Sequence, residues 1–177
     1  MSLEHAVIEA LKKHKGILST VESCTGGQIS HTLTNVSGAS TVFWGASVTY
    51  DNSAKVNLGV SPQTLEKYGA VSEQTARELA ECGLLRLTQS LVHPNSHSSL
   101  SSDSDLISLA TTGIAGPSGG TEQKPIGLCY VGLARRNHPT KVFKILAEST
   151  QTRQVLKQEF TLRALGFLLN ELNQPSG

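Results

Sequence analysis

Two short apolar runs that lead directly into glycine-rich loops constrain the fold of this chain more than any other feature. The first run, ILSTV at 17–21, ends in the stretch VESCTGG and is followed by a helix-like segment. The second, LISLATTG at 106–113, continues into IAGPSGGTEQKPIG at 114–127. Short apolar runs bounded by turn residues are typical of buried strands. Because ligands of open α/β sheets bind at loops that leave strand ends, both loops are expected at one site.

The rest of the chain predicts helices and further strands in an order that suits a layered domain. Apolar residues at helical spacing indicate a helix within MSLEHAVIEALKKHK, with Gly16 as its stop signal. The further strands are expected at 41–50, 128–136 and 140–147, and the further helices at 51–60, 61–69, 72–91 and 149–173. The last helix counts Val155 and Leu162 among its apolar positions. Strand–helix alternation with an antiparallel hairpin predicts a three-layer α/β/α domain with a mixed β-sheet.

One domain is expected to span residues 1–177. A chain of 177 residues is long enough for one sizeable core, and 38% hydrophobic with 16% charged residues is typical of a globular protein. The serine-rich segment 93–105 predicts a surface loop within this domain. It does not mark a boundary, because the chain after it is too short for a second core of comparable size.

Charge and hydropathy argue against two classes of partner. The net charge is +1 and no basic run stands out, so nucleic acid is not the expected partner. No apolar stretch approaches the roughly 18 residues that a membrane span needs, and the N-terminus lacks the apolar region of a signal peptide. The three widely spaced cysteines predict reduced thiols and a cytoplasmic location. The six histidines form no metal-binding pattern, so no metal is expected.

The stretch VESCTGG offers three candidate nucleophiles. A helix that follows Gly26 and Gly27 would aim free N–H groups at a phosphate or an oxyanion in the loop, and the glycines would let a ligand approach the backbone. A serine needs a base to take its proton, whereas a thiolate is the stronger nucleophile. Ser23 ranks first, Cys24 second and Thr25 third. Taken alone, however, the loop favours a purely structural turn.

The second loop and a lysine supply the other possible parts of a site. TTGIAGPSGG holds four glycines in ten residues, matches neither a P-loop nor GxGxxG, and is stiffened by Pro117 and Pro125. Lys55 follows Tyr50 by five residues, across a predicted strand end and helical turn. A lysine that a pocket desolvates can act as a general base, as in Ser–Lys pairs. Taken alone, Lys55 is typical of a solvated surface residue.

Four stretches together resemble the C-terminal domain of the CinA family. They are VESCTGG, VTYDNSAKVNLGV, YGAVSEQTA and TGIAGPSGGTEQKPIG, and the resemblance covers roughly residues 3–172. This domain also occurs alone as nicotinamide mononucleotide deamidase. The resemblance therefore implies hydrolysis of the carboxamide of that nucleotide, giving nicotinic acid mononucleotide and ammonia, in pyridine nucleotide recycling. It implies no cofactor and no metal.

The resemblance also implies roles for individual residues. Ser23 would be the nucleophile, Lys55 the base, and Tyr50 a group that assists proton transfer or positions the amide. The substrate would be contacted by Cys24, Thr25, Gly26, Gly27, Thr112, Gly113, Ile114, Ala115, Gly116 and Arg153. From the chemistry of amide hydrolysis, backbone N–H groups near Cys24, Thr25 and Gly26 could hold the oxyanion. Arg153 and Lys157 lie at helical spacing and could bind the phosphate.

Two departures from the family pattern keep other functions open. STQTR stands where the family usually has Gly-Asp-Arg, and Ser53 replaces a glutamate two residues before the base. Both changes bear on rate or substrate range. The alternative is a catalytically silent nucleotide-binding or regulatory module of the same fold; a factor that contacts DNA is a weaker one, unsupported by the charge pattern. Small α/β enzymes often form homo-oligomers, and a dimer is favoured.

Overall fold

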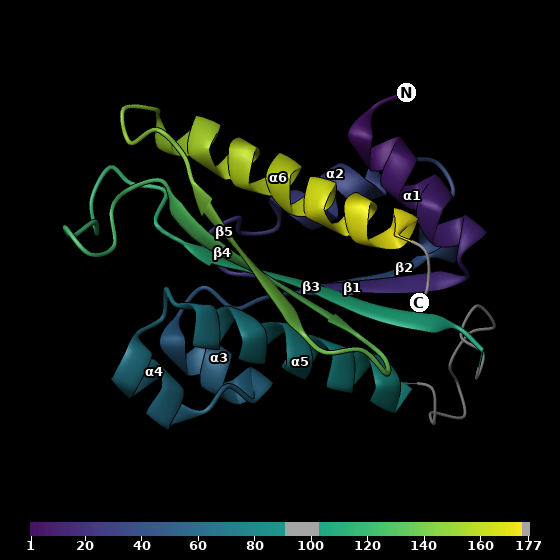
Figure 1. Ribbon diagram of the computed structural model, residues 1–177, viewed down its shortest axis with the longest axis horizontal. Helices are drawn as coiled ribbons and strands as arrows, with labels where there is room; N and C mark the ends of the chain where they lie inside the picture. Colours follow the sequence, from purple (N-terminus) through teal and green to yellow (C-terminus); the bar gives the residue numbers. More distant parts are fainter. Residues whose placement is uncertain (91–102, 175–177) are drawn as a thin grey trace.

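A five-stranded mixed sheet with the order β2-β1-β3-β4-β5 forms the middle layer of the structure (Figure 1). The computed structural model describes residues 1–90 and 103–174. The strands are β1 (Gly16–Glu22), β2 (Phe43–Val48), β3 (Asp105–Gly113), β4 (Leu128–Arg135) and β5 (Lys141–Leu146). β1 pairs in parallel with β2 and β3, whereas β4 runs antiparallel to both β3 and β5. The predicted mixed sheet and its hairpin are therefore confirmed.

Helices cover both faces of this sheet, which confirms the three-layer α/β/α architecture (Figure 1). One face carries α1 (Leu3–Lys13), α2 (Gln28–Thr34) and α6 (Arg153–Asn173), and the short 3₁₀ turn Ala39–Thr41 precedes β2. The other face carries α3 (Asn52–Leu58), α4 (Pro62–Tyr68) and α5 (Glu73–Ser90). None of the helices in the described ranges has the length and apolar character that crossing a membrane requires.

The core lies in two layers, one on each side of the sheet. The larger layer joins α1, α2 and α6 to the sheet through residues such as Leu109 and Phe160. The smaller joins α3 and α5 to it through residues such as Val21 and Leu79. α5 packs directly on the strands, because a Cβ at Gly132 of β4 would collide with the carbonyl of Ala76. This close approach holds the helical layer that carries α3 against the sheet.

Several predicted element ends differ from the structure for local reasons. The first helix ends at Lys13, and Lys15, not Gly16, takes the left-handed conformation (φ 53°) while Gly16 begins β1. The strand predicted at 41–50 is shorter, because Thr41 belongs to the 3₁₀ turn and the strand ends at Val48. These differences arise where backbone hydrogen bonds to neighbouring segments decide the boundary.

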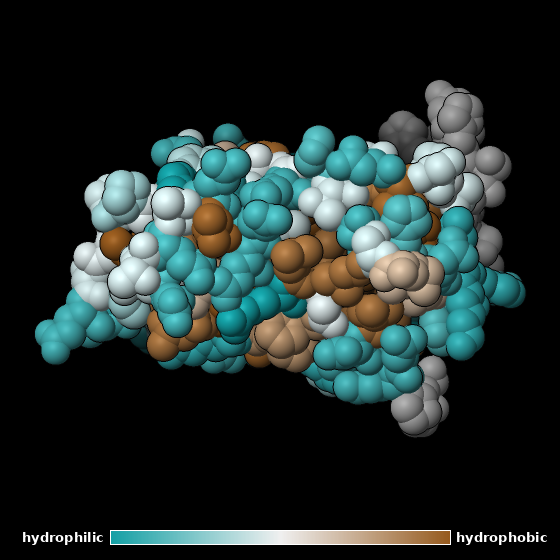
Figure 2. All heavy atoms as spheres, turned by 90° about the horizontal axis from the view of Figure 1, so that it is seen from above, coloured by the Kyte–Doolittle hydropathy of each residue, from teal (hydrophilic) through white to brown (hydrophobic). Residues whose placement is uncertain are grey.

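The last helix also begins later than predicted and exposes part of its apolar surface. It starts at Arg153, four residues after the predicted start at Ser149, because the Thr152 hydroxyl accepts a hydrogen bond from the Val155 amide and caps it. Val155 and Leu162 are 46% and 41% exposed, so they face away from the core. Figure 2 looks down on the layer of α1, α2 and α6 and shows apolar surface among the polar groups.

The serine-rich loop predicted at 93–105 falls mostly outside the described residues, which omit 91–102. Its predicted end is wrong, because Asp105 already belongs to β3. The Asp105 amide donates to the carbonyl of Lys15 (3.0 Å), and its carboxylate pairs with Arg135 at 2.7 Å. These contacts fix Asp105 in the sheet. β1, before this segment, and β3, after it, are neighbours in one sheet.

Candidate functional site

The N-terminus of α2 is filled by the carboxylate of Glu22, the last residue of β1. Glu22 Oε2 accepts hydrogen bonds from the amides of Gly27 (2.9 Å) and Ile29 (3.0 Å) and from the Thr25 hydroxyl (2.8 Å). Its Oε1 accepts from the amide and the hydroxyl of Ser30, both at 2.8 Å. The expectation that these helix N–H groups bind a phosphate or an oxyanion is therefore wrong, since a buried side chain of the protein already occupies them.

Thr25 supports the loop from behind and does not line a cleft. Its side chain is fully buried, and its hydroxyl lies 2.9 Å from that of Thr111 on β3 as well as against Glu22. The prediction that this side chain contacts substrate is contradicted by its inward direction. Gly26 and Gly27 take positive φ angles of 60° and 94°, which lets the chain turn sharply from β1 into α2.

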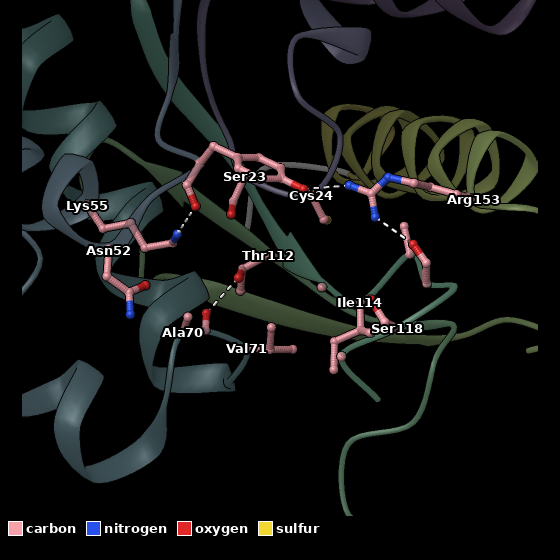
Figure 3. Close-up of a pocket in the computed structure, with 15 residues that line it drawn as sticks. Ser23, Cys24, Asn52, Lys55, Ala70, Val71, Thr112, Ile114, Ser118 and Arg153 are labelled. Carbon is pink, nitrogen blue, oxygen red and sulfur yellow. Dashed lines mark hydrogen bonds between the residues drawn. The ribbon is translucent and has the colours of Figure 1, made fainter. Parts of the chain in front are cut away.

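A cleft of about 240 Å³ lies where the β1–α2 loop meets α3, the β3–β4 loop and the start of α6 (Figure 3). It brings together residues that are far apart in the sequence, among them all three predicted catalytic side chains. The lining residues are Ser23, Cys24, Tyr50, Asn52, Lys55, Ala70, Val71, Thr112, Gly113, Ile114, Ala115, Gly116, Ser118, Gly119 and Arg153. Of the predicted site residues, only Thr25, Gly26 and Gly27 are not among them.

Lys55 is the most unusual side chain of the cleft, because it is only 1% exposed. Its Nζ donates to the carbonyl of Tyr50 at 3.0 Å. Burial lowers the pKa of the Lys55 amine, and the electrostatic influence of the nearby Asp51 and Cys24 side chains partly opposes this. The solvated position that its residue type alone suggests is therefore wrong. A lysine with a lowered pKa has more neutral amine near pH 7, which is the form that accepts a proton.

The short helix α3 holds Lys55 in this position. Asp51 caps its N-terminus by accepting from the amide (2.8 Å) and the hydroxyl (2.5 Å) of Ser53. Ser53, where the family pattern has glutamate, thus strengthens the cap and brings no charge to the cleft. The helix ends at Leu58, and Val60 donates back to the Lys55 carbonyl at 3.0 Å.

Arg153 ties three segments together at the mouth of the cleft. As the first residue of α6, it donates from Nη2 to the Tyr50 hydroxyl (2.5 Å) and from Nη1 to the Gly116 carbonyl (2.7 Å). Figure 3 shows two hydrogen bonds that leave the Arg153 guanidinium in different directions. On the floor, the Thr112 hydroxyl donates to the Ala70 carbonyl at 2.6 Å. The glycine-rich loop, α6 and the segment before α3 are thus held in one arrangement.

Ser23 presents a free hydroxyl to the cleft. Its amide donates to the Thr111 carbonyl and its carbonyl accepts from the Gly26 amide, both at 3.1 Å. Within the described part of the chain its hydroxyl makes no hydrogen bond, and neither do the amides of Cys24 and Thr25. Of the three amides expected to hold an oxyanion, that of Gly26 is engaged and that of Thr25 belongs to a fully buried residue outside the cleft lining, so the Cys24 amide is the one placed at the cleft.

A second, wider cleft of about 590 Å³ lies on the other side of Arg153. It is lined by Gly26, Gly27, Gln28, His31, Arg153, Gln154 and Lys157. As predicted from their spacing, Arg153 and Lys157 share one face of α6. Among the described residues none that lines this cleft carries a carboxylate, and Arg153 and Lys157 make its charge positive. Groups of three or more His, Cys, Asp or Glu that could hold a metal ion do not occur in ranges 1–90 and 103–174.

Sequence reasoning missed two kinds of residue. Asn52, Ala70, Val71, Ser118 and Gly119 also line the first cleft, and all five lie within the motifs quoted above, although none was singled out as a site residue. Glu22 belongs to the stretch VESCTGG. Its role as an acceptor at the start of α2 depends on hydrogen-bond donors that lie up to eight residues later in the chain. A carboxylate that directly precedes a glycine turn and a helix is the signal that could have found it.

Comparisons with known proteins match nearly the whole chain. Residues 1–92 and 96–172 match the family model described as the CinA C-terminal domain. A CinA-like protein of Trichormus variabilis is 38% identical over 97% of this chain, and one of Pseudothermotoga lettingae is 50% identical over 76%. The chain spans only 38% and 29% of the lengths of these two relatives.

Solved structures of similar length share the fold. The competence/damage inducible protein CihA of Agrobacterium tumefaciens matches with a TM-score of 0.82 and 35% identity, over 97% of this chain and 94% of that one. A CinA superfamily protein of Klebsiella pneumoniae matches with a TM-score of 0.82 and 26% identity, over 96% and 95%. The names of these proteins do not state a reaction.

Proposed function

Because the chain belongs to the CinA C-terminal domain family, we propose that it hydrolyses the carboxamide of nicotinamide mononucleotide, releasing nicotinic acid mononucleotide and ammonia. One observation carries this proposal above the others: a buried lysine with a lowered pKa lines the same cleft as an unbonded serine hydroxyl. A serine becomes an effective nucleophile only when a neighbouring base accepts its proton. Lys55 and Ser23 supply these two parts without a metal or a cofactor.

The reaction follows from the groups around the cleft. The neutral Lys55 amine takes the proton of Ser23, and the serine oxygen attacks the carboxamide carbon. The amide of Cys24, which lines the cleft, stabilises the oxyanion that forms. The Lys55 ammonium returns its proton to the leaving nitrogen, and ammonia departs from an ester on Ser23. A water molecule, activated by Lys55, then hydrolyses that ester.

The second cleft supports a substrate that carries a phosphate. Arg153 belongs to both clefts, so a ligand that reaches past it would contact the amide-hydrolysing groups and the positive charge of Lys157 together. Guanidinium and ammonium groups are the side chains that commonly bind phosphate. We therefore assign the nucleotide's phosphate to the side of Arg153 that holds Lys157.

The positions of the sulfur and oxygen atoms support Ser23 over Cys24 as the nucleophile. The Cys24 sulfur lies 3.7 Å from that of Cys129, so its thiol is engaged with a second thiol, whereas the Ser23 hydroxyl makes no bond within the described residues. A catalytically silent binding module is the second candidate. It is favoured by one contact, because the Lys55 amine donates to the Tyr50 carbonyl and not to Ser23.

Ammonia release from nicotinamide mononucleotide separates these candidates. Wild-type protein should release ammonia, Ser23→Ala should release none above background, and Cys24→Ala should remain active. Calorimetry on the same samples measures binding. Binding without turnover by the wild type would replace the enzyme with the silent module, and a fully active Ser23→Ala protein would overturn the serine mechanism.

A further inference from the structure

Two of the three cysteines meet at the floor of the first cleft. The sulfurs of Cys24 and Cys129 lie 3.7 Å apart, although the two residues are distant in the sequence. Cys24 lines the cleft and is 5% exposed, whereas Cys129 on β4 is fully buried. The third cysteine, Cys82, lies on α5 at the other face of the sheet, beside Gly59. The proposed hydrolysis uses neither thiol of the pair.

The sheet explains why these thiols meet. β3 lies between β1 and β4, and its last residue, Gly113, is the register partner of Cys129. β1 ends at Glu22, opposite Thr111, so that Cys24 follows at the level where β3 ends. A Cβ at Gly113 would lie 2.8 Å from the Cβ of Cys129 and would crowd it. The glycine therefore allows the close approach of β3 to Cys129 on β4.

We propose that Cys24 and Cys129 form a modification site, at which a hydroperoxide converts the two thiols to a disulfide that reversibly disables the cleft. In the first step the Cys24 thiolate attacks a peroxide oxygen, the O–O bond breaks, and Cys24 becomes a sulfenic acid. In the second step the Cys129 sulfur attacks the Cys24 sulfur, and the S–O oxygen leaves as water. The pair loses two electrons and two protons, and with hydrogen peroxide the products are two water molecules.

The environments of the two thiols indicate which of them reacts first with the peroxide. Cys24 lines the cleft and can be reached from it, whereas Cys129 is fully buried. Burial raises the pKa of the Cys129 thiol, and the neighbouring Cys24 raises it further. A sulfenic acid at Cys24 is neutral and removes that repulsion. Cys24 therefore reacts first with the peroxide, and Cys129 closes the bond.

Closing the bond changes the catalytic loop. A disulfide joins its sulfurs at about 2.05 Å, so the two sulfurs must approach each other by more than an ångström from 3.7 Å. β4 is held on both sides by β3 and β5, whereas Cys24 lies in the turn after β1. Cys24 is thus the residue that moves, and its amide and the adjacent Ser23 move with it. A displacement of this size costs roughly a hundredfold in rate at a catalytic group.

The test treats the whole chain with a small excess of hydrogen peroxide, alkylates remaining thiols in denaturant, and measures intact and peptide masses. The wild type should lose about 2 Da, keep Cys82 open to alkylation and yield a cross-linked peptide that joins Cys24 to Cys129. Dithiothreitol should reverse this. Cys129→Ser should instead gain about 16 or 32 Da at Cys24, and Cys82→Ser should behave as the wild type.

Ammonia release provides a second readout. It should fall roughly a hundredfold in the peroxide-treated wild type and recover with dithiothreitol, whereas treated Cys129→Ser should not recover from sulfinic acid. The proposal is overturned if Cys24 and Cys129 both remain alkylatable in treated wild type, or if Cys129→Ser gives the same reversible product. The masses decide this even if the protein releases no ammonia, so the outcome is independent of the proposed hydrolysis.

Discussion

The guanidinium of Arg153 donates to the hydroxyl of Tyr50 at 2.5 Å, joining the start of the last helix to the segment that precedes the buried lysine. Tyr50 is 60% exposed, so this contact and not packing holds its ring at the mouth of the cleft. The same guanidinium also binds the carbonyl of Gly116. Arg153 is therefore placed to set the width of the entrance between the two clefts.

Replacing Arg153 with glutamine should impair both binding and turnover. The change removes the contacts to Tyr50 and Gly116 and one positive charge from the second cleft. We expect kcat/KM for nicotinamide mononucleotide to fall about 10²-fold, since a charge-assisted contact is worth about 1.5–3 kcal/mol. The control is Arg163→Gln, on the same helix but in an exposed ion pair with Glu159. An equal fall of kcat/KM in Arg153→Gln and Arg163→Gln would contradict a role of Arg153 at the cleft.

Activity and stability should both rise with pH as Lys55 loses its proton. Burial lowers the pKa of Lys55 in the folded protein, so between that pKa and the ordinary value of the unfolded chain the folded state binds fewer protons. The free energy of unfolding therefore increases with pH across this window, and the gain is lost as pH falls through the folded pKa. The neutral, basic form of Lys55 increases over the same range, which gives kcat/KM a rising limb.

The variant Lys55→Met tests whether Lys55 causes the pH dependence of both the activity and the free energy of unfolding. Activity should fall by about 10²–10⁴-fold, and the rising limb of stability should flatten, because the remaining lysines do not share this buried position. Stability near neutral pH should hold or increase, since a buried amine is exchanged for an apolar group of similar length. Lys144→Met, at an exposed position of β5, should leave both profiles unchanged. Rate profiles and chemical denaturation series supply the measurements.

Glu22→Gln should destabilise the fold without touching the cleft directly. The carboxylate accepts five hydrogen bonds from four residues of the loop and α2, and an amide offers one oxygen and an NH₂ group that opposes these donors. We expect a loss of about 2–4 kcal/mol in the free energy of unfolding. The exposed Glu66→Gln serves as the control. A loss below about 0.5 kcal/mol, the range of ordinary surface changes, would argue against the anchoring role.

Lys157→Gln should distinguish substrates by their phosphate. Its ammonium lies near Gly26 in the second cleft, and Lys157 is not part of the lining of the first cleft, which holds Ser23 and Lys55. We expect KM for nicotinamide mononucleotide to rise about tenfold with kcat little changed, because binding is weakened equally in the ground and transition states. The kcat/KM for nicotinamide riboside, which lacks the phosphate, should be the same in the wild type and in Lys157→Gln. A parallel loss with the riboside would show that Lys157 acts on the loop and not on the phosphate.

Local patterns in the sequence were sufficient to predict the elements and their layers. Apolar runs and caps depend on neighbours a few residues away, which is why β1, α3 and the hairpin of β4 and β5 are where they were expected. The cytoplasmic location and the dimer stay predictions. Apolar surface on the face of α1 and α6 accompanies the exposed Val155 and Leu162, with no partner in the structure to show what covers it.

The sequence predicted most of the residues that line the cleft, but not which of their side chains are buried or which way they point. The family motifs brought Ser23, Tyr50 and Lys55 together correctly, yet residue type alone placed Lys55 in solvent, because burial is set by packing of distant segments. Thr25 points inward because its hydroxyl donates to Glu22 and lies at hydrogen-bond distance from the hydroxyl of Thr111. The contact of Cys24 with Cys129 arises from strand order, which no spacing along the chain reveals.

The pairing of β1 with β3 has a consequence for the order in which the cleft forms. β1 pairs through Gly16 with Asp105 of β3, and this contact spans more than half of the chain. Pairings between such distant residues close large loops and are slow to form. Ser23 and Lys55 therefore come to line one complete cleft only after the second half of the polypeptide has joined the sheet, because residues 112–116 and Arg153 supply its other walls.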